Sequence, residues 1–127
     1  MQFIPCDNAP FIPASHEDPL KPGVLKRVIA DRHLLHAGQV PMLNWSRLPA
    51  GSSFRRHYHE DMQEIFILLS GCVVMNVEDE SVTMNAGDTV IVEPREVHEM
   101  QNIGSTDADY LVFGIAGTNN GRTVVVE

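Results

Sequence analysis

Four side chains that can bind a metal ion lie in two short stretches of the sequence. His57 and His59 are two residues apart, Glu64 follows after a four-residue gap, and His98 comes from a later stretch. Residues two apart on a β-strand point to the same face, so we expect the two imidazoles of the first pair to share one ion. Imidazole and carboxylate bind divalent Fe, Mn, Ni, Co, Zn and Cu. The residues therefore predict one transition-metal ion without selecting the metal.

The predicted site has room for chemistry at the metal. If the ion is octahedral, four protein ligands leave two positions for water, a substrate or dioxygen, as a catalytic site requires and a closed structural site does not. No further histidine is spaced as a general base, and we expect His16, His33 and His36 to be solvated on the surface. The motifs GxGxxG, GxxxxGK[ST], GxSxG and HExxH are absent, which excludes dinucleotide, ATP and serine-hydrolase chemistry of those types.

The elements that must position these ligands read as short β-strands. From Val24 onward, apolar and β-branched runs are bounded by Gly, Pro, Asn, Asp or Ser, and no stretch has helical periodicity. The pattern predicts an all-β jelly roll with glycines at its corners. Residues 1–23, rich in proline, are expected to form an N-terminal arm, and residues 24–127 the barrel domain. The expected strands are residues 24–30, 40–48, 64–70, 72–77, 81–84, 88–93, 97–102 and 109–115.

Composition narrows the classes of partner. The 127 residues fit one domain, and 17 acidic against 9 basic residues give a net charge of -8. Such a charge repels nucleic acid and anionic membrane surfaces, so neither is expected as a partner. Cys6 and Cys72 are far apart and form no CxxC motif, and no secretory signal or spanning segment is evident, so a reducing cytoplasm is the expected location.

The metal-binding stretches resemble the two motifs of the cupin family. The first is Gly51-x5-His57-x-His59-x4-Glu64-x6-Gly71, and the second begins at Gly87 and contains His98 and Asn102. The resemblance implies a double-stranded β-helix, or jelly-roll barrel, with the three histidines and the glutamate as metal ligands. The second motif departs from the family's Pro-x-Gly, because this chain has Glu93-Pro94-Arg95. We therefore expect a different turn before His98, with Arg95 directed toward the barrel opening.

The resemblance also implies a range of functions. We favour a metal-dependent oxidoreductase of the dioxygenase type that acts on a small organic molecule, such as an acid or a thiol. A sugar-phosphate isomerase is an alternative, weakened by the acidic charge and the lack of clustered lysines. A non-catalytic module that binds or senses a small ligand is another. Cupins commonly pair, and the apolar residues of the N-terminal arm lead us to expect a homodimer in which the arm lies across the partner.

Other side chains are expected to line a mostly apolar cavity around the metal. Strand alternation from the ligands nominates Phe66, Leu68, Met100 and Asn102, although packing in the core explains them equally well. The polar residues nominated to orient a substrate are Asn44, Arg47, Arg55 and Gln63. Arg47 is the strongest of these, because a guanidinium can bind a carboxylate with two hydrogen bonds, and a surface salt bridge is its alternative role.

Overall fold

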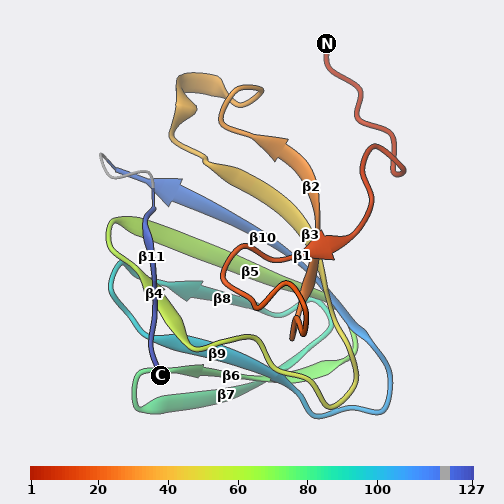
Figure 1. Cartoon of the computed structure of the whole chain (residues 1–127), viewed down its shortest axis with the longest axis vertical. Coiled ribbons are helices and arrows are strands. Elements are labelled where there is room, and N and C mark those ends of the chain that lie inside the picture. Colours follow the sequence, from red (N-terminus) through yellow and green to blue (C-terminus); the bar gives the residue numbers. More distant parts are fainter. Residues whose placement is uncertain (118–120) are drawn as a thin grey trace.

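The computed structural model describes residues 1–117 and 121–127, which form an all-β jelly roll (Figure 1). A 3-10 turn, η1, covers His36–Gly38. The strands are Ile12–Pro13 (β1), Leu25–Asp31 (β2), Met42–Leu48 (β3), His57–His59 (β4), Met62–Ser70 (β5), Cys72–Val77 (β6), Glu80–Asn85 (β7), Thr89–Val92 (β8), His98–Asn102 (β9), Ala108–Ala116 (β10) and Thr123–Val125 (β11).

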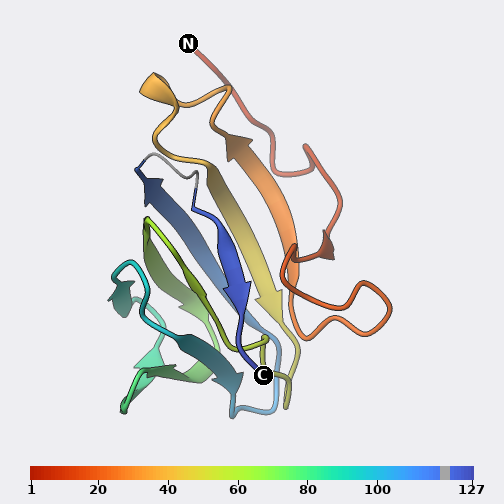
Figure 2. The same ribbon diagram turned by 60° about the vertical axis from the view of Figure 1, so that its left-hand side comes forward.

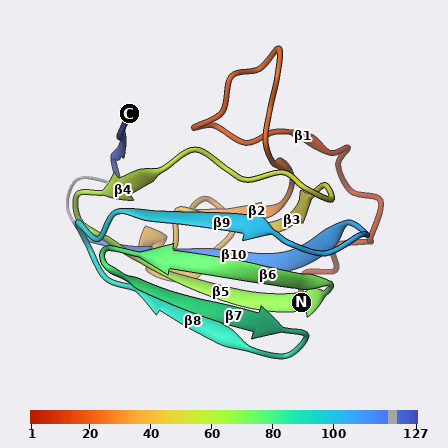
Figure 3. The same cartoon turned by 90° about the horizontal axis from the view of Figure 1, so that it is seen from below.

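The strands form two antiparallel sheets, and β10 and β9 lie centrally in them. The first sheet has the order β1-β2-β3-β10-β5-β8, and the second has the order β11-β4-β9-β6-β7. β4, β9 and β6 belong to one sheet and β3, β10 and β5 to the other, and Figure 3 shows these strands from below. Side chains on the facing sides of the two sheets therefore meet in the interior.

The interior side of each strand follows from its alternation of residues. In β5, the buried residues are Met62, Glu64, Phe66 and Leu68, and the residues between them are only partly buried. The core is filled by side chains from both sheets, with Leu48, Leu68, Met75, Met84 and Met100 fully buried. A carboxylate at the second inward position of β5 interrupts this apolar pattern and places a charge inside the barrel.

Glycine makes the sharp corners possible, as predicted. Gly51, Gly71 and Gly87 have φ values of +74°, +92° and +94°, a region that residues with a Cβ rarely adopt. Gly71 also packs closely, because a Cβ there would lie 2.9 Å from the Cβ of Ala108. This corner connects β5 to β6, so it carries the chain from one sheet to the other.

The eight strands predicted from the sequence are all present, with ends that shift by no more than a few residues. The strand pattern missed β1, β4 and β11, which have two or three residues and are too short to show alternation, although the spacing of His57 and His59 had implied a strand at β4. β1 lies within the expected N-terminal arm and pairs with β2. A membrane-crossing helix is absent from the part of the chain that the structure describes.

The N-terminal arm packs along its own barrel (Figure 2). The Asn8 amide donates a 3.0 Å hydrogen bond to the carbonyl of Val28, and the Arg27 guanidinium donates to the carbonyl of Cys6. After β1, the arm turns across the edge of the barrel, where Ala14 and Glu17 are buried. This segment therefore forms part of the wall around the interior.

Candidate metal centre

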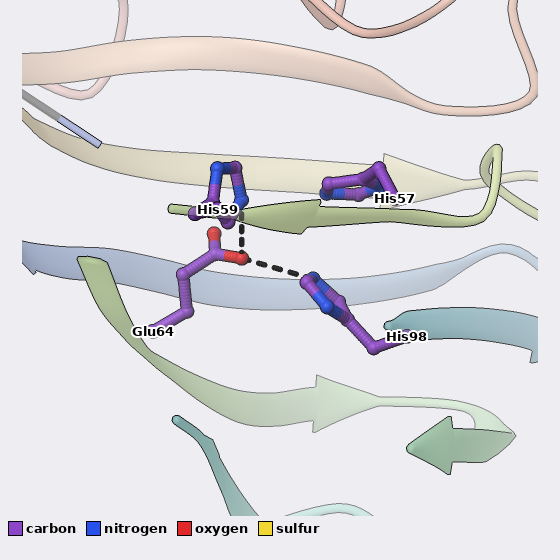
Figure 4. Close-up of side chains that lie close together, drawn as sticks. All are labelled: His57, His59, Glu64 and His98. Carbon is purple, nitrogen blue, oxygen red and sulfur yellow. Dashed lines mark hydrogen bonds and ion pairs between the residues drawn. The ribbon is translucent and has the colours of Figure 1, made fainter. Parts of the chain in front are cut away.

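The four predicted ligands converge inside the barrel (Figure 4). His57 and His59 lie on β4 with both rings buried, and Tyr58 between them is only partly buried. Glu64 follows on β5, and His98 on β9 is the register partner of His57. One possible ligand atom from each residue lies within 4.8 Å of the others. All four residues are at most 6% exposed.

Backbone carbonyls hold each imidazole through its Nδ1 atom. Nδ1 of His57 is 2.6 Å from the carbonyl oxygen of Arg55, and Nδ1 of His98 is 2.9 Å from that of Glu96. Nδ1 of His59 is 3.2 Å from the carbonyl oxygen of Gly121. Because a carbonyl only accepts, each Nδ1 carries the hydrogen and the Nε2 lone pair remains available. Outer hydrogen bonds of this kind commonly orient the histidine ligands of metals.

The Nε2 atoms surround one carboxylate oxygen. Oε1 of Glu64 lies 2.7 Å from Nε2 of His59 and 3.0 Å from Nε2 of His98. Nε2 of His59 is buried and has no partner in hydrogen-bonding alignment. Without a cation, the Nε2 lone pairs of His59 and His98 would face the Glu64 carboxylate oxygen at short range and repel it. A divalent cation among the four groups would remove this repulsion. The donor set therefore fits a transition-metal ion.

The pKa values of these groups show how strongly the charges interact. Burial lowers the pKa of His57 to about 2. Burial also opposes protonation of His59, but the Glu64 carboxylate outweighs it and raises the pKa of that ring. The pKa of Glu64 is lowered, because His59 and His98 outweigh the effect of its burial. Metal binding replaces protons at such ligands, so the site is expected to bind a cation more tightly as pH rises.

The turn before His98 keeps a glycine-like backbone without a glycine. Arg95 has φ of +71°, and its N–H donates a 2.7 Å hydrogen bond to the carbonyl of His59. That bond connects the turn to β4 and so helps position two ligands together. The Arg95 side chain is exposed and is not part of the cavity wall described below. At the position where the family motif has glycine, Arg95 therefore adopts a backbone conformation that favours glycine, and its side chain is outside the cavity wall.

A cavity of about 150 Å³ opens beside the metal ligands. It is smaller than the roughly 300–1,000 Å³ typical of sites for drug-sized ligands, so it suits a molecule of few atoms. Apolar groups make up the larger part of the wall, as predicted, and polar groups contribute the rest. The wall is formed by Ala14, Ser15, His16, Lys26, Pro41, Met42, Asn44, Ser46, Phe54, His57, His59, Met62, Glu64, Phe66, Tyr110, Val112, Gly121 and Thr123.

His16 was expected on the solvated surface, and the structure shows this to be wrong. Its side chain is 17% exposed and stacks on His57, with ring centroids 4.1 Å apart. Burial lowers the pKa of His16 to about 4. The neighbouring Glu17 holds the arm in place by accepting hydrogen bonds from the N–H groups of Gly23 and Arg55. His33 and His36 are exposed, as predicted.

Of the polar residues nominated to orient a substrate, Asn44 lies in the cavity wall. It is 6% exposed, and its Oδ1 atom has no hydrogen-bond partner among the described residues. Gln63 alternates with the inward Glu64 and donates to Glu93 on the outside of the barrel. The structure therefore brings Asn44 toward the metal ligands and directs Gln63 away from them.

The two nominated arginines are engaged elsewhere. Arg47 donates two 2.9 Å hydrogen bonds to Asp109 and lies 4.5 Å from the ring centre of Phe11. Arg55 forms an exposed pair with Glu127. Neither arginine is part of the cavity wall. Arg47 thus has its alternative role, a surface salt bridge, because the β3–β10 register places Asp109 directly opposite it.

The inward strand positions that pack around the ligands divide into cavity and core. Phe66 lines the cavity, whereas Leu68 and Met100 are fully buried in the apolar core. Asn102 has a structural role. Its amide donates to the carbonyls of Leu48 and Thr106, and its Oδ1 accepts from the N–H of Gly104.

Sequence reasoning missed several polar groups of the cavity wall, among them Lys26 and Tyr110. Lys26 alternates in phase with Val24, which is buried, and Val28, so a lysine in phase with apolar residues was the available signal. Tyr110 lies on β10 in register with Ser46, to which its hydroxyl is hydrogen-bonded. Burial raises the pKa of Tyr110, so this phenol is neutral over the physiological range.

Comparison with known proteins gives a consistent relationship. Residues 44–114 match the model of the Cupin domain family. An uncharacterized protein of Methanocaldococcus jannaschii is 28% identical over 114 residues, which cover 87% of this chain and 91% of that protein. The oxalate-binding protein of Thermotoga maritima is 37% identical over 65 residues, which cover 51% of this chain and 54% of that protein.

A solved structure shares both the fold and part of the sequence. The crystal structure of a predicted oxalate decarboxylase from Thermotoga maritima superposes with a TM-score of 0.70 at 29% identity. The matched region covers 74% of this chain and 81% of that one. The family model spans the residues from Asn44 through all four metal-ligand candidates to Gly114.

Proposed function

This chain belongs to the cupin family, and we propose that it is a metal-dependent oxidoreductase, of the dioxygenase type, that acts on a small organic molecule. The observation that carries the proposal is the position of the ligand set. His57, His59 and Glu64 all form part of the cavity wall, so an ion bound to them would contact the cavity. A site enclosed by protein on every side would instead support a structural ion.

The proposed ion is one divalent transition metal per chain, held by His57, His59, Glu64 and His98. A redox-active metal with free coordination positions would supply binding of an organic ligand together with dioxygen. The chain's own contribution is positional. The backbone carbonyls orient the imidazoles, and Phe54 and Phe66 exclude water from the side of the cavity next to the ligands.

Small organic acids are the proposed substrate class. The names of two similar proteins refer to oxalate, one as a binding protein and one as a predicted decarboxylase. The cavity volume of about 150 Å³ fits a ligand of that size. A sugar phosphate has less support, because Lys26 is the one lysine or arginine among the described residues of the wall.

The first test is the metal content of protein purified without chelators or added metal. We expect a near-stoichiometric transition metal, measured by elemental analysis, that is lost from the double variant His57→Ala/His98→Ala. The matched control is His33→Ala/His36→Ala, which removes two exposed histidines and should retain the metal. Equal metal content in the wild type and the His57/His98 variant would contradict the proposed site, provided that both are folded by circular dichroism.

A non-catalytic binding protein is the second candidate, favoured by the name of the oxalate-binding relative. The two functions differ in turnover. Metal-loaded enzyme should consume dioxygen, or convert the acid, in proportion to time and protein concentration. A binding protein should take up one equivalent of the acid and release it unchanged, as measured by chromatography of the ligand after denaturation of the complex. Iron or manganese in the purified protein would favour the oxidoreductase, and zinc or nickel the binding or isomerase roles.

A further inference from the structure

Lys26 brings a positive charge to the cavity without a matching negative charge. Its Nζ atom donates a 2.7 Å hydrogen bond to the hydroxyl of Ser15. None of the ion pairs found among the described residues involves Lys26. Burial lowers its pKa, as expected for an ammonium group that is partly desolvated with a neutral partner. An anionic ligand would supply the missing partner.

The position of Lys26 places this charge on the wall that faces the metal ligands. Lys26 lies on β2 in register with Ser46 of β3, and both side chains line the cavity. Three of the ligands lie on β4 and β9, which belong to the sheet opposite β2. Glu64 lies on β5, in the same sheet as β2. Ser15 is exposed, which puts the Lys26 ammonium at the outer part of the cavity. A ligand between the two groups would extend from the metal toward the opening.

The charges of the cavity specify the charge of its ligand. A divalent cation offset by Glu64, together with the Lys26 ammonium, leaves an excess of two positive charges. His16 adds no charge at neutral pH, because burial lowers its pKa to about 4. No other charged side chain is found among the described residues of the wall. This excess occurs inside a protein of net charge -8, so it is local to the cavity.

We infer that Lys26 selects a small dicarboxylate, binding one carboxylate while the other is held at the metal centre. The inference rests on the proposed function, and it adds the substrate class and the residue that determines it. A dianion with two separated ends balances both positive centres, whereas a monocarboxylate leaves one of them unpaired. The cavity volume of about 150 Å³ restricts the spacer between the carboxylates to very few carbons.

The test is calorimetric titration of metal-loaded protein with malonate, acetate and inorganic phosphate. The variants are Lys26→Met, which keeps the length of the side chain without its charge, and Lys26→Arg, which keeps the charge. Lys21→Met is the matched control, since Lys21 is exposed and outside the cavity wall. A hydrogen bond to a charged group contributes roughly 1.5–3 kcal/mol, or about 10- to 100-fold in affinity.

The inference predicts that affinity is lost mainly for malonate, and only in the Lys26→Met variant. Lys26→Met should weaken malonate binding about 10- to 100-fold and acetate binding less than about 3-fold. Lys26→Arg and Lys21→Met should keep most of the affinity for malonate. Equal malonate affinity in Lys26→Met and Lys21→Met would overturn the inference. So would wild-type protein that binds acetate or phosphate at least as tightly as malonate.

Metal analysis of the same samples separates this inference from the proposed function. If the wild type and Lys26→Met hold equal metal and the malonate affinities do not differ, Lys26 has no selective role and the metal centre stands. If the wild type retains no metal at its four ligands after reconstitution and dialysis, the proposed function fails and the inference fails with it. Metal measured after each titration also shows whether malonate removed the ion from the protein.

Discussion

Glu17 offers a direct test of the way the N-terminal arm is attached. Its side chain is 2% exposed, and its carboxylate accepts two short hydrogen bonds, 2.6 Å from the nitrogen of Gly23 and 2.7 Å from the nitrogen of Arg55. The same residue follows His16, which stacks on His57. Replacing Glu17 with alanine should therefore loosen the segment that forms one wall of the cavity.

The size of the effect follows from the two hydrogen bonds. Hydrogen bonds to a charged group contribute about 1.5–3 kcal/mol each, so their loss alone gives about 3–6 kcal/mol. Two terms reduce this value. The variant no longer buries a carboxylate, and the freed N–H groups can regain water when the arm moves. We expect Glu17→Ala to lower the free energy of unfolding by about 2 kcal/mol, and Glu17→Gln, which keeps one acceptor oxygen, to lower it by about half as much.

Urea unfolding followed by circular dichroism gives the free energy, and limited proteolysis reports on the arm. Glu17→Ala should also speed cleavage within residues 1–23 under conditions where the barrel stays folded. Glu127→Ala is the control, because it removes the exposed partner of Arg55 and should change the free energy by less than about 0.5 kcal/mol. If Glu17→Ala unfolds within about 0.5 kcal/mol of the wild type and its arm resists protease equally, the arm is not held by this carboxylate.

Two further predictions concern a cavity residue and the oligomeric state. Asn44→Leu removes a buried Oδ1 atom that has no hydrogen-bond partner among the described residues. In urea titrations of the metal-free protein, this change should raise the free energy of unfolding by up to about 1 kcal/mol. Unchanged or lower stability would show that water satisfies this atom. The homodimer stays a prediction: deleting residues 1–10, which spares β1 and Glu17, should give a monomer by light scattering, and a dimer that survives the deletion would exclude the arm as its basis.

The barrel and the ligand set could be predicted because local sequence encodes both. Alternation within β5 and β10 marks their inward faces, and the spacing of His57 and His59 places both rings on one side of β4. The glycine corners are likewise visible, since a positive φ demands a particular residue type. These features depend on neighbours close in the chain, whereas His98, 34 residues after Glu64, was recognised from the second motif.

The rest of the cavity depends on contacts between distant segments. Arg47 lies opposite Asp109, 62 residues away, and only the pairing of β3 with β10 reveals that its guanidinium is already engaged. His16 sits in a proline-rich segment without periodicity, and its burial results from the attachment of the arm through Glu17. Lys26 lies on a strand whose inward face was recognisable, but a charged residue is not normally assigned to an inward face. In each case a contact between distant segments decides where the side chain lies.

Main-chain carbonyls of Arg55, Glu96 and Gly121 each lie at the Nδ1 atom of one imidazole, and among the described residues only His59 has a side-chain partner there as well, the Thr123 hydroxyl at 3.0 Å. Any residue type supplies a carbonyl, so substitution at Arg55 or Glu96 leaves that acceptor present as long as the backbone path is kept. Alanine scanning across these positions would therefore not detect the carbonyl contacts that orient the histidines. Changes that move the backbone, such as a proline or a one-residue deletion near Arg55, would misalign an imidazole without altering any ligand. The proposed metal site should therefore tolerate side-chain substitutions at Arg55 and Glu96 but not insertions or deletions that move their backbone.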